Sequence, residues 1–416
     1  MLVADMTSVS FWPAIFTVIR DFSMIILEVL LGISFLLWFA LAIFLMWCAI
    51  GVTILRPGQK GAIPVRAPKV SIIVPARNEE DALPAAIESF IKLDYPDYEV
   101  IVVDDASTDG TGRIADEWSA RPSGRAPVRV IHNRELPDGW TGKVHALSVA
   151  ARVVTGEWIL ATDADMVFHP EILKLAISLA LEKDAQLVSL IPEFELGGFW
   201  EKVILPAFTL LLSTLYPIRL VNRPNFPRAL AAGAFILMRR ADFEALGGYA
   251  PLKDTVVEDL RMAEHFKKHG RRIFLAASRG LFHTRMYSGL GELWEGLSRS
   301  AFEGSGFSVV KIVIGVMGGI LVGVLPWVSF VVLLLLGAVS RNSSSGGLAL
   351  ALAIATCVES TLIYLPVMIL LRVPIPYVFT LPLAAIFYMG VALNSMFKSV
   401  FGSGVPWKGR RYHPPA

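Results

Sequence analysis

Long and short apolar runs divide the chain into a central region and two flanks. The flanks contain the long runs, Met24–Leu55 and then about 311–337, 347–371 and 375–397. About 20 apolar residues span a bilayer as a helix, so each long run predicts a membrane helix. The first run is too long for the apolar part of a signal peptide. The sequence therefore predicts an amino-terminal membrane anchor at residues 1–56 and further membrane helices at 309–397.

Basic residues and prolines near these runs bear on their topology. Arg56, Lys60 and Arg66 follow the first run, so the positive-inside rule places the central region in the cytoplasm. Three carboxyl-terminal spans would leave the basic tail, residues 398–416, on the opposite side. One of the three is therefore not a simple span. The last run is predicted to be re-entrant or interfacial because prolines interrupt it, at Pro374, Pro376 and Pro382.

The central region has short apolar runs that alternate with segments of helical spacing. The short runs predict strands at Val70–Pro75, Glu99–Val103, Val128–Ile131, Glu157–Thr162 and Gln186–Ile191. Helices are predicted between them at Asp81–Leu93, Asp109–Ala120, Gly142–Val154 and Pro170–Glu182. Strands that alternate with helices of this length form a parallel sheet covered on both faces. The predicted fold class is therefore α/β.

Polar segments follow three of the predicted strands. Pro75–Glu79 follows the first strand, Asp104–Gly110 the second and Asp163–Asp165 the fourth. The carboxyl ends of parallel strands meet at one edge of the sheet, where open α/β folds bind ligands. Asp, Ser and Thr are also common turn and N-cap residues. That explanation is poor for Asp104 and Asp105, because adjacent carboxylates repel each other and need partners.

The Asp163-Ala164-Asp165 segment is the most informative of the three. Side chains alternate faces along a strand, so both carboxylates are expected to point the same way, roughly 7 Å apart. Paired carboxylates suit a hard divalent cation and, through it, a diphosphate. A solvated strand end also tolerates two acids, so this segment by itself is a weak indication of a metal site.

Composition narrows the possible classes of function. The chain has 416 residues, of which 54% are hydrophobic and 18% charged, and its formal net charge is +2. An ordinary soluble domain is about 25% charged, and the apolar runs explain the difference. A net charge near zero gives no support to a nucleic-acid partner. Cys48 and Cys357 both lie in apolar runs, which argues against a disulfide framework or a zinc site.

Four segments in order resemble family 2 glycosyltransferases. Val70–Gly110 contains Val-Pro-Ala-Arg-Asn-Glu-Glu and Val-Val-Asp-Asp-Ala-Ser-Thr-Asp-Gly, which resemble the opening of those enzymes. Gly156–Asp165 resembles their D-x-D segment. Three further segments resemble their acceptor-side half: Gly233–Arg240, Gly247–Tyr249 and Val257–Asp259. The resemblance implies a GT-A fold with a mostly parallel sheet at 66–305. It also implies an inverting sugar transfer from a nucleotide-diphosphate donor, with a UDP-sugar favoured.

The resemblance implies which residues bind the donor. Asp165 is expected to bind Mg²⁺ or Mn²⁺ directly, and Asp163 to act through the ribose, a water or the outer shell of the metal. Lys143, after Trp140-Thr141-Gly142 at a helix start, would reach a phosphate or the donor sugar. A solvated helix-start lysine is the alternative. The remaining nucleotide-binding candidates are Pro75, Arg77, Glu79, Asp104 and Asp105.

The resemblance also implies roles on the acceptor side. Asp259 matches the catalytic base of the family, which takes the proton of the acceptor hydroxyl, and Glu258 would support it. The alternative for Asp259 is a helix N-terminal acid favoured by the helix dipole. Gly233 would supply backbone for the acceptor cleft. Arg299 or Arg285 could meet the diphosphate.

The chain lacks one motif of the processive members of the family. These enzymes carry Q-x-x-R-W after the base, whereas the corresponding stretch here is Trp294–Ser300, with the sequence Trp-Glu-Gly-Leu-Ser-Arg-Ser. The difference favours a single transfer to a lipid over polysaccharide synthesis. His283 could contact the metal or a phosphate, or could be a structural histidine.

An apolar strip, Phe199–Leu220, interrupts the predicted catalytic domain. It is interpreted as an interfacial helix at 199–220 that docks the domain on the membrane and lines the route of an apolar acceptor. A buried core helix is the alternative. Together with the apolar flanks and the terminal Pro406–Tyr412, the strip resembles the hopanoid-biosynthesis-associated glycosyltransferases, whose relatives act on ceramides and carotenoids.

This narrower resemblance implies a partner and a location. The acceptor would be a membrane lipid, hopanoid or isoprenoid-like or ceramide-like, and the protein would be integral to the bacterial inner membrane with its catalytic domain in the cytoplasm. Two alternatives stay open at this point. One is a processive polysaccharide synthase, and the other is a non-catalytic nucleotide-sugar-binding membrane protein or transporter.

Overall fold

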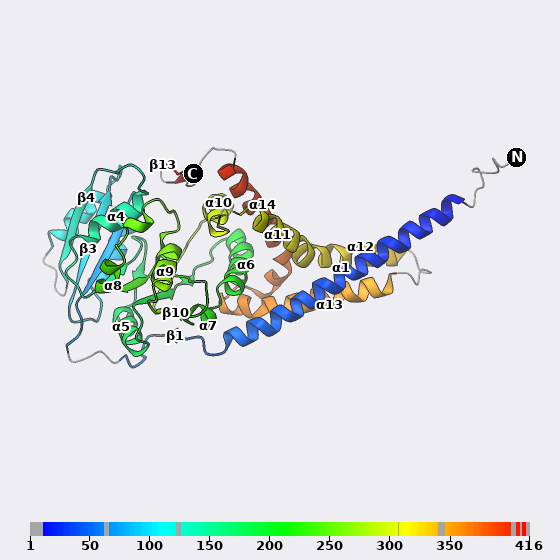
Figure 1. Ribbon diagram of the computed structural model, residues 1–416, viewed down its shortest axis with the longest axis horizontal. Coiled ribbons are helices and arrows are strands. Elements are labelled where there is room, and N and C mark those ends of the chain that lie inside the picture. Colours follow the sequence, from blue (N-terminus) through cyan, green and yellow to red (C-terminus); the bar gives the residue numbers. More distant parts are fainter. Residues whose placement is uncertain are drawn as a thin grey trace.

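The computed structural model describes residues 11–61, 66–121, 126–306, 308–339, 346–400, 405–407 and 410–412. An α/β domain lies at one end of the molecule, and a set of long helices extends away from it (Figure 1). Helices α6 (Phe199–Leu215) and α10 (Leu290–Gly304) lie between these two parts. Helix α1 (Phe11–Ala49) begins at the far end of the long helices and leads back to the α/β domain.

The centre of the α/β domain is an eight-stranded sheet in the order β1-β10-β7-β9-β5-β2-β3-β4. Its strands are β1 (Ile54–Leu55), β2 (Val70–Ala76), β3 (Tyr98–Asp105), β4 (Val128–Asn133), β5 (Trp158–Ala161), β7 (Leu187–Ile191), β9 (Ile236–Arg239) and β10 (Ile273–Ser278). β9 runs antiparallel to its neighbours β5 and β7, and the other pairs are parallel. The predicted α/β class with a mostly parallel sheet is confirmed.

Alternate strand residues enter two apolar cores, one on each face of the sheet. In β2, Val70, Ile72 and Val74 pack in one core and Ile73 in the other. Because side chains alternate across a strand, a continuous apolar run fills both cores at once. The first face is covered by α2 (Leu83–Phe90), α3 (Thr111–Ser119) and α5 (Ile172–Glu182), and the second by α4 (Gly142–Ala151), α8 (Arg240–Ala245) and α9 (Glu258–Lys268).

The sequence did not predict β10, α8 or α10, nor several shorter elements. A second sheet contains β6 (Val167–Phe168), β11 (Phe282–Thr284) and β8 (Glu193–Phe194) in that order, and a 3₁₀ turn, η1, covers Ala250–Leu252. The antiparallel β9 has four residues. Runs this short carry no periodicity that distinguishes a strand from a loop, so their pairing follows from tertiary contacts.

Among the described residues, five helices are long and apolar enough to cross a membrane, judged by length and composition. They cover Val18–Ala49, Phe199–Val221, Val309–Gly337, Gly347–Leu370 and Ile375–Val400. The elements are α1, α6 with α7 (Ile218–Val221), α11 (Val309–Gly318), the π-helix η2 (Gly319–Val324), α12 (Leu325–Val339), α13 (Gly347–Leu370), η3 (Ile375–Thr380) and α14 (Leu381–Val400). The apolar runs thus form helices, and their membrane topology stays a prediction.

Helix α6 connects the α/β domain to the long helices. Its residues Val203 and Leu205 are buried in a core that also contains Tyr364 of α13 and Phe387 of α14. Phe199, at the start of α6, is 52% exposed. One side of α6 is therefore buried in a core, as the alternative interpretation expected. The interfacial role of its exposed side stays a prediction.

Two short strands at the carboxyl terminus, β12 (Val405–Trp407) and β13 (Arg410–Tyr412), form an antiparallel hairpin. Of the predicted basic tail, residues 401–404, 408–409 and 413–416 lie outside the described residues. The same is true of residues 1–10 and of most of the polar link between the first two carboxyl-terminal apolar runs, 340–345.

Candidate active site

The polar segments predicted from the sequence meet at the carboxyl edge of the sheet. Ala76 of β2 pairs with Asp104 of β3, and Asp105 of β3 pairs with Asn133 of β4. β5 lies on the other side of β2 and ends at Ala161. Parallel register therefore brings the three loops that follow β2, β3 and β5 together, as the sequence predicted.

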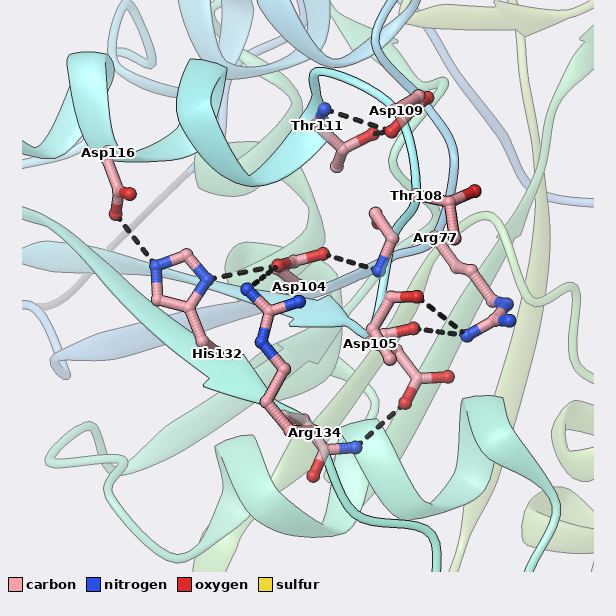
Figure 2. Close-up of polar contacts among 12 residues, drawn as sticks. Arg77, Asp104, Asp105, Thr108, Asp109, Thr111, Asp116, His132 and Arg134 are labelled. Atoms are coloured by element: carbon pink, nitrogen blue, oxygen red, sulfur yellow. Dashed lines mark hydrogen bonds and ion pairs between the residues drawn. The ribbon is translucent and has the colours of Figure 1, made fainter.

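Asp104 is buried, and three neighbours use its carboxylate (Figure 2). Its Oδ1 accepts the Ser107 backbone N–H at 3.1 Å, and its Oδ2 lies 3.0 Å from His132 Nδ1 and 3.5 Å from Arg134 Nη2. Burial alone would raise the pKa of Asp104, but these hydrogen bonds and the Arg134 charge outweigh it and leave the pKa lowered. Asp104 thus holds the loop after β3 as an ionised carboxylate.

Asp105 has a different set of partners. Its Oδ1 accepts a hydrogen bond of 2.8 Å from the side-chain amide of Asn133, and the same amide nitrogen lies 3.2 Å from His145 Nδ1. All three residues are buried. His145 also makes an edge-to-face contact with Trp140, at 5.5 Å between ring centroids. No sequence pattern pointed to Asn133 or His145, because their roles depend on strands and helices that are far apart in the chain.

The other nucleotide-binding candidates shape the same loops. Arg77 Nη1 donates to the backbone carbonyls of Asp105 at 2.6 Å and Ala106 at 3.1 Å. The Glu79 backbone N–H donates to Thr111 Oγ1 at 2.7 Å. Pro75 is half-buried near the end of β2. The structure therefore brings these residues to the predicted edge, and their contacts with a nucleotide stay a prediction.

The Asp163-Ala164-Asp165 segment lies in a turn, because β5 ends two residues earlier at Ala161. The expectation that strand geometry aligns the two carboxylates was therefore wrong. Partial burial of its carboxylate and the charges of Asp163 and Glu79 raise the pKa of Asp165 to about 6. The Asp163 and Glu79 carboxylates thus lie close enough to Asp165 to oppose its ionisation.

Lys143 connects the turn after β5 to the start of α9. Its Nζ lies 2.6 Å from Asp163 Oδ1 and 2.6 Å from Glu258 Oε1. Burial opposes the charge, but the two carboxylates outweigh it and raise the pKa of Lys143 well above its usual value. Lys143 is therefore not the solvated helix-start lysine of the alternative interpretation. Two of its three N–H donors serve carboxylates, and one is left for a further acceptor.

Asp259 lies beside this ion-pair cluster. Its Oδ2 accepts the Gly233 backbone N–H at 3.0 Å, and its Oδ1 accepts the Leu260 N–H at 2.7 Å. Burial and the neighbouring Glu258 carboxylate raise the pKa of Asp259 to about 6. A carboxylate with this pKa is a suitable proton acceptor near neutral pH.

Gly233 lies at the centre of these groups. A Cβ atom there would be 3.3 Å from Asp259 Oδ2, 3.5 Å from Lys143 Nζ and 3.7 Å from Asp163 Oδ2. The segment before β9 thus approaches the cluster through its backbone. The predicted role of Gly233 in an acceptor cleft stays a prediction.

Thr141, which was not among the predicted site residues, links the start of α4 to the loop before α9 through two hydrogen bonds. Its backbone N–H donates to the Lys253 carbonyl at 2.7 Å, and its hydroxyl donates to the Thr255 carbonyl at 3.0 Å. The start of α4 therefore contacts both the turn after β5, through Lys143, and the approach to α9.

The remaining acceptor-side candidates lie towards the long helices. Arg299 is on α10, where its charge acts on Tyr287. Arg285 Nη2 lies 3.2 Å from Glu201 Oε1 at the start of α6. His283 Nε2 lies 3.2 Å from Glu195 Oε1. In the described structure these three side chains interact with nearby protein groups. Contact of any of them with a diphosphate stays a prediction.

The residues at the carboxyl edge of the sheet include acids that could bind a divalent cation. Within the described residues, no group of three or more His, Cys, Asp or Glu side chains is arranged to hold a metal ion. However, Asp163, Asp165 and Glu79 concentrate negative charge there, which raises the pKa of Asp165. Mg²⁺ commonly takes one or two carboxylates and completes its shell with substrate phosphates and water. The residues fit a cation that arrives with a diphosphate.

Comparison with known proteins agrees with this geometry. Residues 71–247 match the sequence model of Glycosyl transferase family 2. EpsE of Bacillus subtilis (strain 168), named as a glycosyltransferase, is 38% identical over 211 residues, which cover 49% of this chain and 69% of that protein. The 4,4'-diaponeurosporenoate glycosyltransferase of Staphylococcus aureus (strain USA300) is 26% identical over 254 residues, which cover 60% of this chain and 64% of that protein.

A solved structure shows the same fold. It is the mannosyltransferase PcManGT from Pyrobaculum calidifontis, with a TM-score of 0.55 and 19% sequence identity over 89% of this chain and 99% of that chain. The protein is therefore an α/β enzyme of the GT-A fold. It belongs to glycosyltransferase family 2, and it is a glycosyltransferase. This membership argues against the non-catalytic alternative.

Proposed function

We propose that the protein transfers a sugar, with inversion, from a nucleotide-diphosphate donor to the hydroxyl of a membrane lipid. The observation that carries this proposal is the meeting of Lys143, Asp163 and Glu258 with Asp259 and Gly233 at the carboxyl edge of the sheet. Donor-side and acceptor-side motifs, which lie about 100 residues apart in the chain, thereby share one cluster.

The nucleotide would occupy the edge formed by the loops after β2 and β3. Asp105 would contact the base and ribose, with Arg77, Glu79 and Pro75 around it. Asp104 would act indirectly, because Ser107, His132 and Arg134 already use its carboxylate. A UDP-sugar is the favoured donor. PcManGT, which shares the fold, was solved with GDP-Man and Mn²⁺, so the assay must include both classes of nucleotide.

Asp165, with Asp163 in support, would hold Mg²⁺ or Mn²⁺ together with the diphosphate. When bound, the cation would neutralise the negative charge of the leaving diphosphate. Lys143 would add its remaining N–H to the same end of the donor while Asp163 and Glu258 hold its ammonium group in place.

Asp259 would act as the general base. The acceptor oxygen forms a bond to the anomeric carbon as the bond from that carbon to the diphosphate oxygen breaks, and the hydroxyl proton passes to the Asp259 carboxylate. The electron pair of the broken bond leaves with the nucleoside diphosphate. Hydrogen bonds from Gly233 and Leu260 fix the orientation of the carboxylate.

A lipid acceptor is supported by the long apolar helices beside the α/β domain. α6 packs between the two parts of the molecule and exposes apolar side chains such as Phe199. The S. aureus relative is named for a transfer to 4,4'-diaponeurosporenoate. We propose a hopanoid or isoprenoid-like lipid as the acceptor, with a ceramide-like lipid second, at the cytoplasmic face of a bacterial inner membrane.

The test is a transfer assay with the full-length protein in detergent. Nucleotide sugars with UDP and GDP are supplied singly with Mn²⁺ or Mg²⁺ and total lipid extract, and products are identified by mass spectrometry. We expect one glycolipid, loss of product with EDTA, and an apparent metal affinity reduced about 10- to 100-fold in Asp165→Asn. A ladder of sugar polymers would instead identify a processive synthase. Full activity of Asp165→Asn without added metal would contradict the assigned cation site.

A further inference from the structure

Two arginines stack on one tryptophan where α1 meets α7. The guanidinium carbon of Arg219 lies 4.4 Å from the ring centroid of Trp47, and that of Arg223 lies 5.4 Å from it. Arg219 Nη1 also donates to the Trp47 backbone carbonyl at 2.7 Å. Trp47, Arg219 and Arg223 are called here the basic-aromatic cluster. None of these residues belongs to the candidate active site.

The charge of this cluster is not balanced by acids. Among the described side chains, no carboxylate lies within 4.0 Å of a nitrogen of Arg219 or Arg223. Two surface arginines of the α/β domain differ, since Arg113 pairs with Glu117 and Arg261 pairs with Glu264. Stacking on an aromatic ring stabilises a guanidinium group but leaves its positive charge in place.

The cluster is held in position by the sheet. Asn222, between the two arginines, donates from Nδ2 to the Leu275 carbonyl at 2.9 Å and accepts the Leu275 N–H at 2.7 Å through Oδ1. Leu275 belongs to β10, so the segment after α7 is clamped to a strand of the central sheet. The two cationic groups therefore project from a fixed platform, which reduces the ordering needed to bind an anion.

The position of the cluster selects the kind of anion. Both Val18–Ala49 and Phe199–Val221 are apolar enough to cross a membrane, and both end at this cluster. Trp is enriched at the level of lipid headgroups, and Lys and Arg beside the cytoplasmic end of a membrane helix favour anionic lipids. Arginine donates to phosphate oxygens through its planar fork.

We propose that the basic-aromatic cluster binds the phosphate of an anionic phospholipid such as phosphatidylglycerol. The proposal rests on the membrane setting proposed above and not on the sugar-transfer chemistry. The two guanidinium groups hold the headgroup phosphate, and Trp47 lies beside the upper acyl region. This lipid would fix the height of the α/β domain over the membrane, and hence the distance between the active site and an acceptor hydroxyl.

The experiment is native mass spectrometry of the full-length protein in detergent, titrated with phosphatidylglycerol or with phosphatidylcholine of the same chains. No donor or acceptor is present, so the result is independent of glycosyltransfer. We expect the wild type to bind phosphatidylglycerol several-fold more tightly than phosphatidylcholine. Arg219→Gln/Arg223→Gln should weaken phosphatidylglycerol binding about tenfold and remove the preference, on the scale of two lost charge-assisted contacts.

The matched control is Arg121→Gln, because Arg121 follows α3 of the α/β domain and stacks on Trp118 at 4.0 Å. It should keep wild-type lipid binding. If the double variant is unstable, Arg223→Gln alone leaves the bond from Arg219 to the Trp47 carbonyl intact and should still weaken binding. Equal binding of both lipids by the wild type, or unchanged binding by Arg223→Gln and the double variant, would overturn the proposal. Displacement of phosphatidylglycerol by millimolar inorganic phosphate would also overturn it in favour of a free anion.

Discussion

Asp104 and Asp259 each belong to a pair of adjacent acids at the same edge of the sheet, and their pKa values shift in opposite directions. In the loop after β3, Asp104 is buried and contacts Ser107, His132 and Arg134, and its pKa is lowered. At the start of α9, burial and Glu258 raise the pKa of Asp259 to about 6. The residue types are similar, but the number of donors and positive charges around each carboxylate differs.

The difference separates a structural acid from a chemical one. A carboxylate whose pKa is lowered stays ionised over the whole physiological range. It is therefore a poor proton acceptor, but its hydrogen bonds hold the loop in place. A carboxylate with a pKa near 6 can take a proton in the reaction and release it afterwards. The ammonium group of Lys143 pairs with Asp163 and Glu258. Its charge lowers the pKa of Asp259, but burial and the Glu258 carboxylate outweigh it.

The substitution Asp259→Asn should have the largest effect, because it tests directly whether Asp259 takes a proton. The amide oxygen can keep one of the backbone hydrogen bonds, from Gly233 or Leu260, but the side chain can no longer take a proton. We expect kcat to fall by about 10²- to 10⁴-fold, with the melting temperature and nucleotide binding close to wild type. Asp254→Asn, an exposed acid on the preceding loop, is the control. Activity within tenfold of wild type would remove Asp259 from the role of base.

The next effect is on the pH dependence of turnover. Asp259 must be ionised to accept the proton, so kcat/KM should fall about tenfold per pH unit below about 6. The pKa of Asp165 is also raised to about 6, but saturating Mn²⁺ competes with its proton and should remove that contribution. Rates measured from pH 4.5 to 8 at saturating Mn²⁺ would isolate Asp259. A flat profile down to pH 5 would contradict the assignment.

Gly233→Ala should have a smaller effect on the same cluster. The added methyl would lie 3.3 Å from Asp259 Oδ2 and 3.5 Å from Lys143 Nζ, so these groups must shift by a few tenths of an ångström. Because small misplacements at reacting centres are costly, we expect kcat/KM to fall by about fivefold to tenfold. Gly291→Ala on α10, where a Cβ meets nothing within 4 Å, should retain wild-type values. Equal effects of both variants would mean that the close packing at Gly233 is unimportant.

The smallest expected effect concerns the structural acid. His132 hydrogen-bonds to Asp104 and Asp116, and both raise its pKa. A raised pKa adds stability that is complete below the unfolded value of about 6.5 and is lost as the pH rises through the folded value. His132→Ala should therefore cost about 1 kcal/mol or less at pH 6, and less at pH 9.

Thermal unfolding of the full-length protein at the two pH values would measure this difference. His132 is partly exposed, with 35% of its side chain accessible, so solvent screening limits the effect. A larger destabilisation at pH 9 than at pH 6 would show that the bond to Asp104 is not charge-assisted. A loss of turnover as large as that of Asp259→Asn, without a change in stability, would place the two acid pairs in the same functional class.

The predictions from sequence succeeded where a local pattern carries the information. The strands Val70–Ala76 and Tyr98–Asp105 were placed within two residues, because a short apolar run bounded by turn residues is typical of a buried strand. They failed for the alignment of Asp163 with Asp165, because the end of β5 depends on its pairing with β2 and β9. A strand's last residue is set by its neighbours rather than by its own composition.

The α/β class, the apolar flanks and the segments that supply the site could all be predicted from the amino-acid sequence, since periodicity and the order of motifs are local properties of the chain. How those residues act together depends on the folded arrangement. It placed Lys143 between Asp163 and Glu258, Gly233 against Asp259, and Asn133 between Asp105 and His145. Proton affinity depends on distances of a few ångströms between residues far apart in sequence, so two similar acid pairs could be distinguished only after folding.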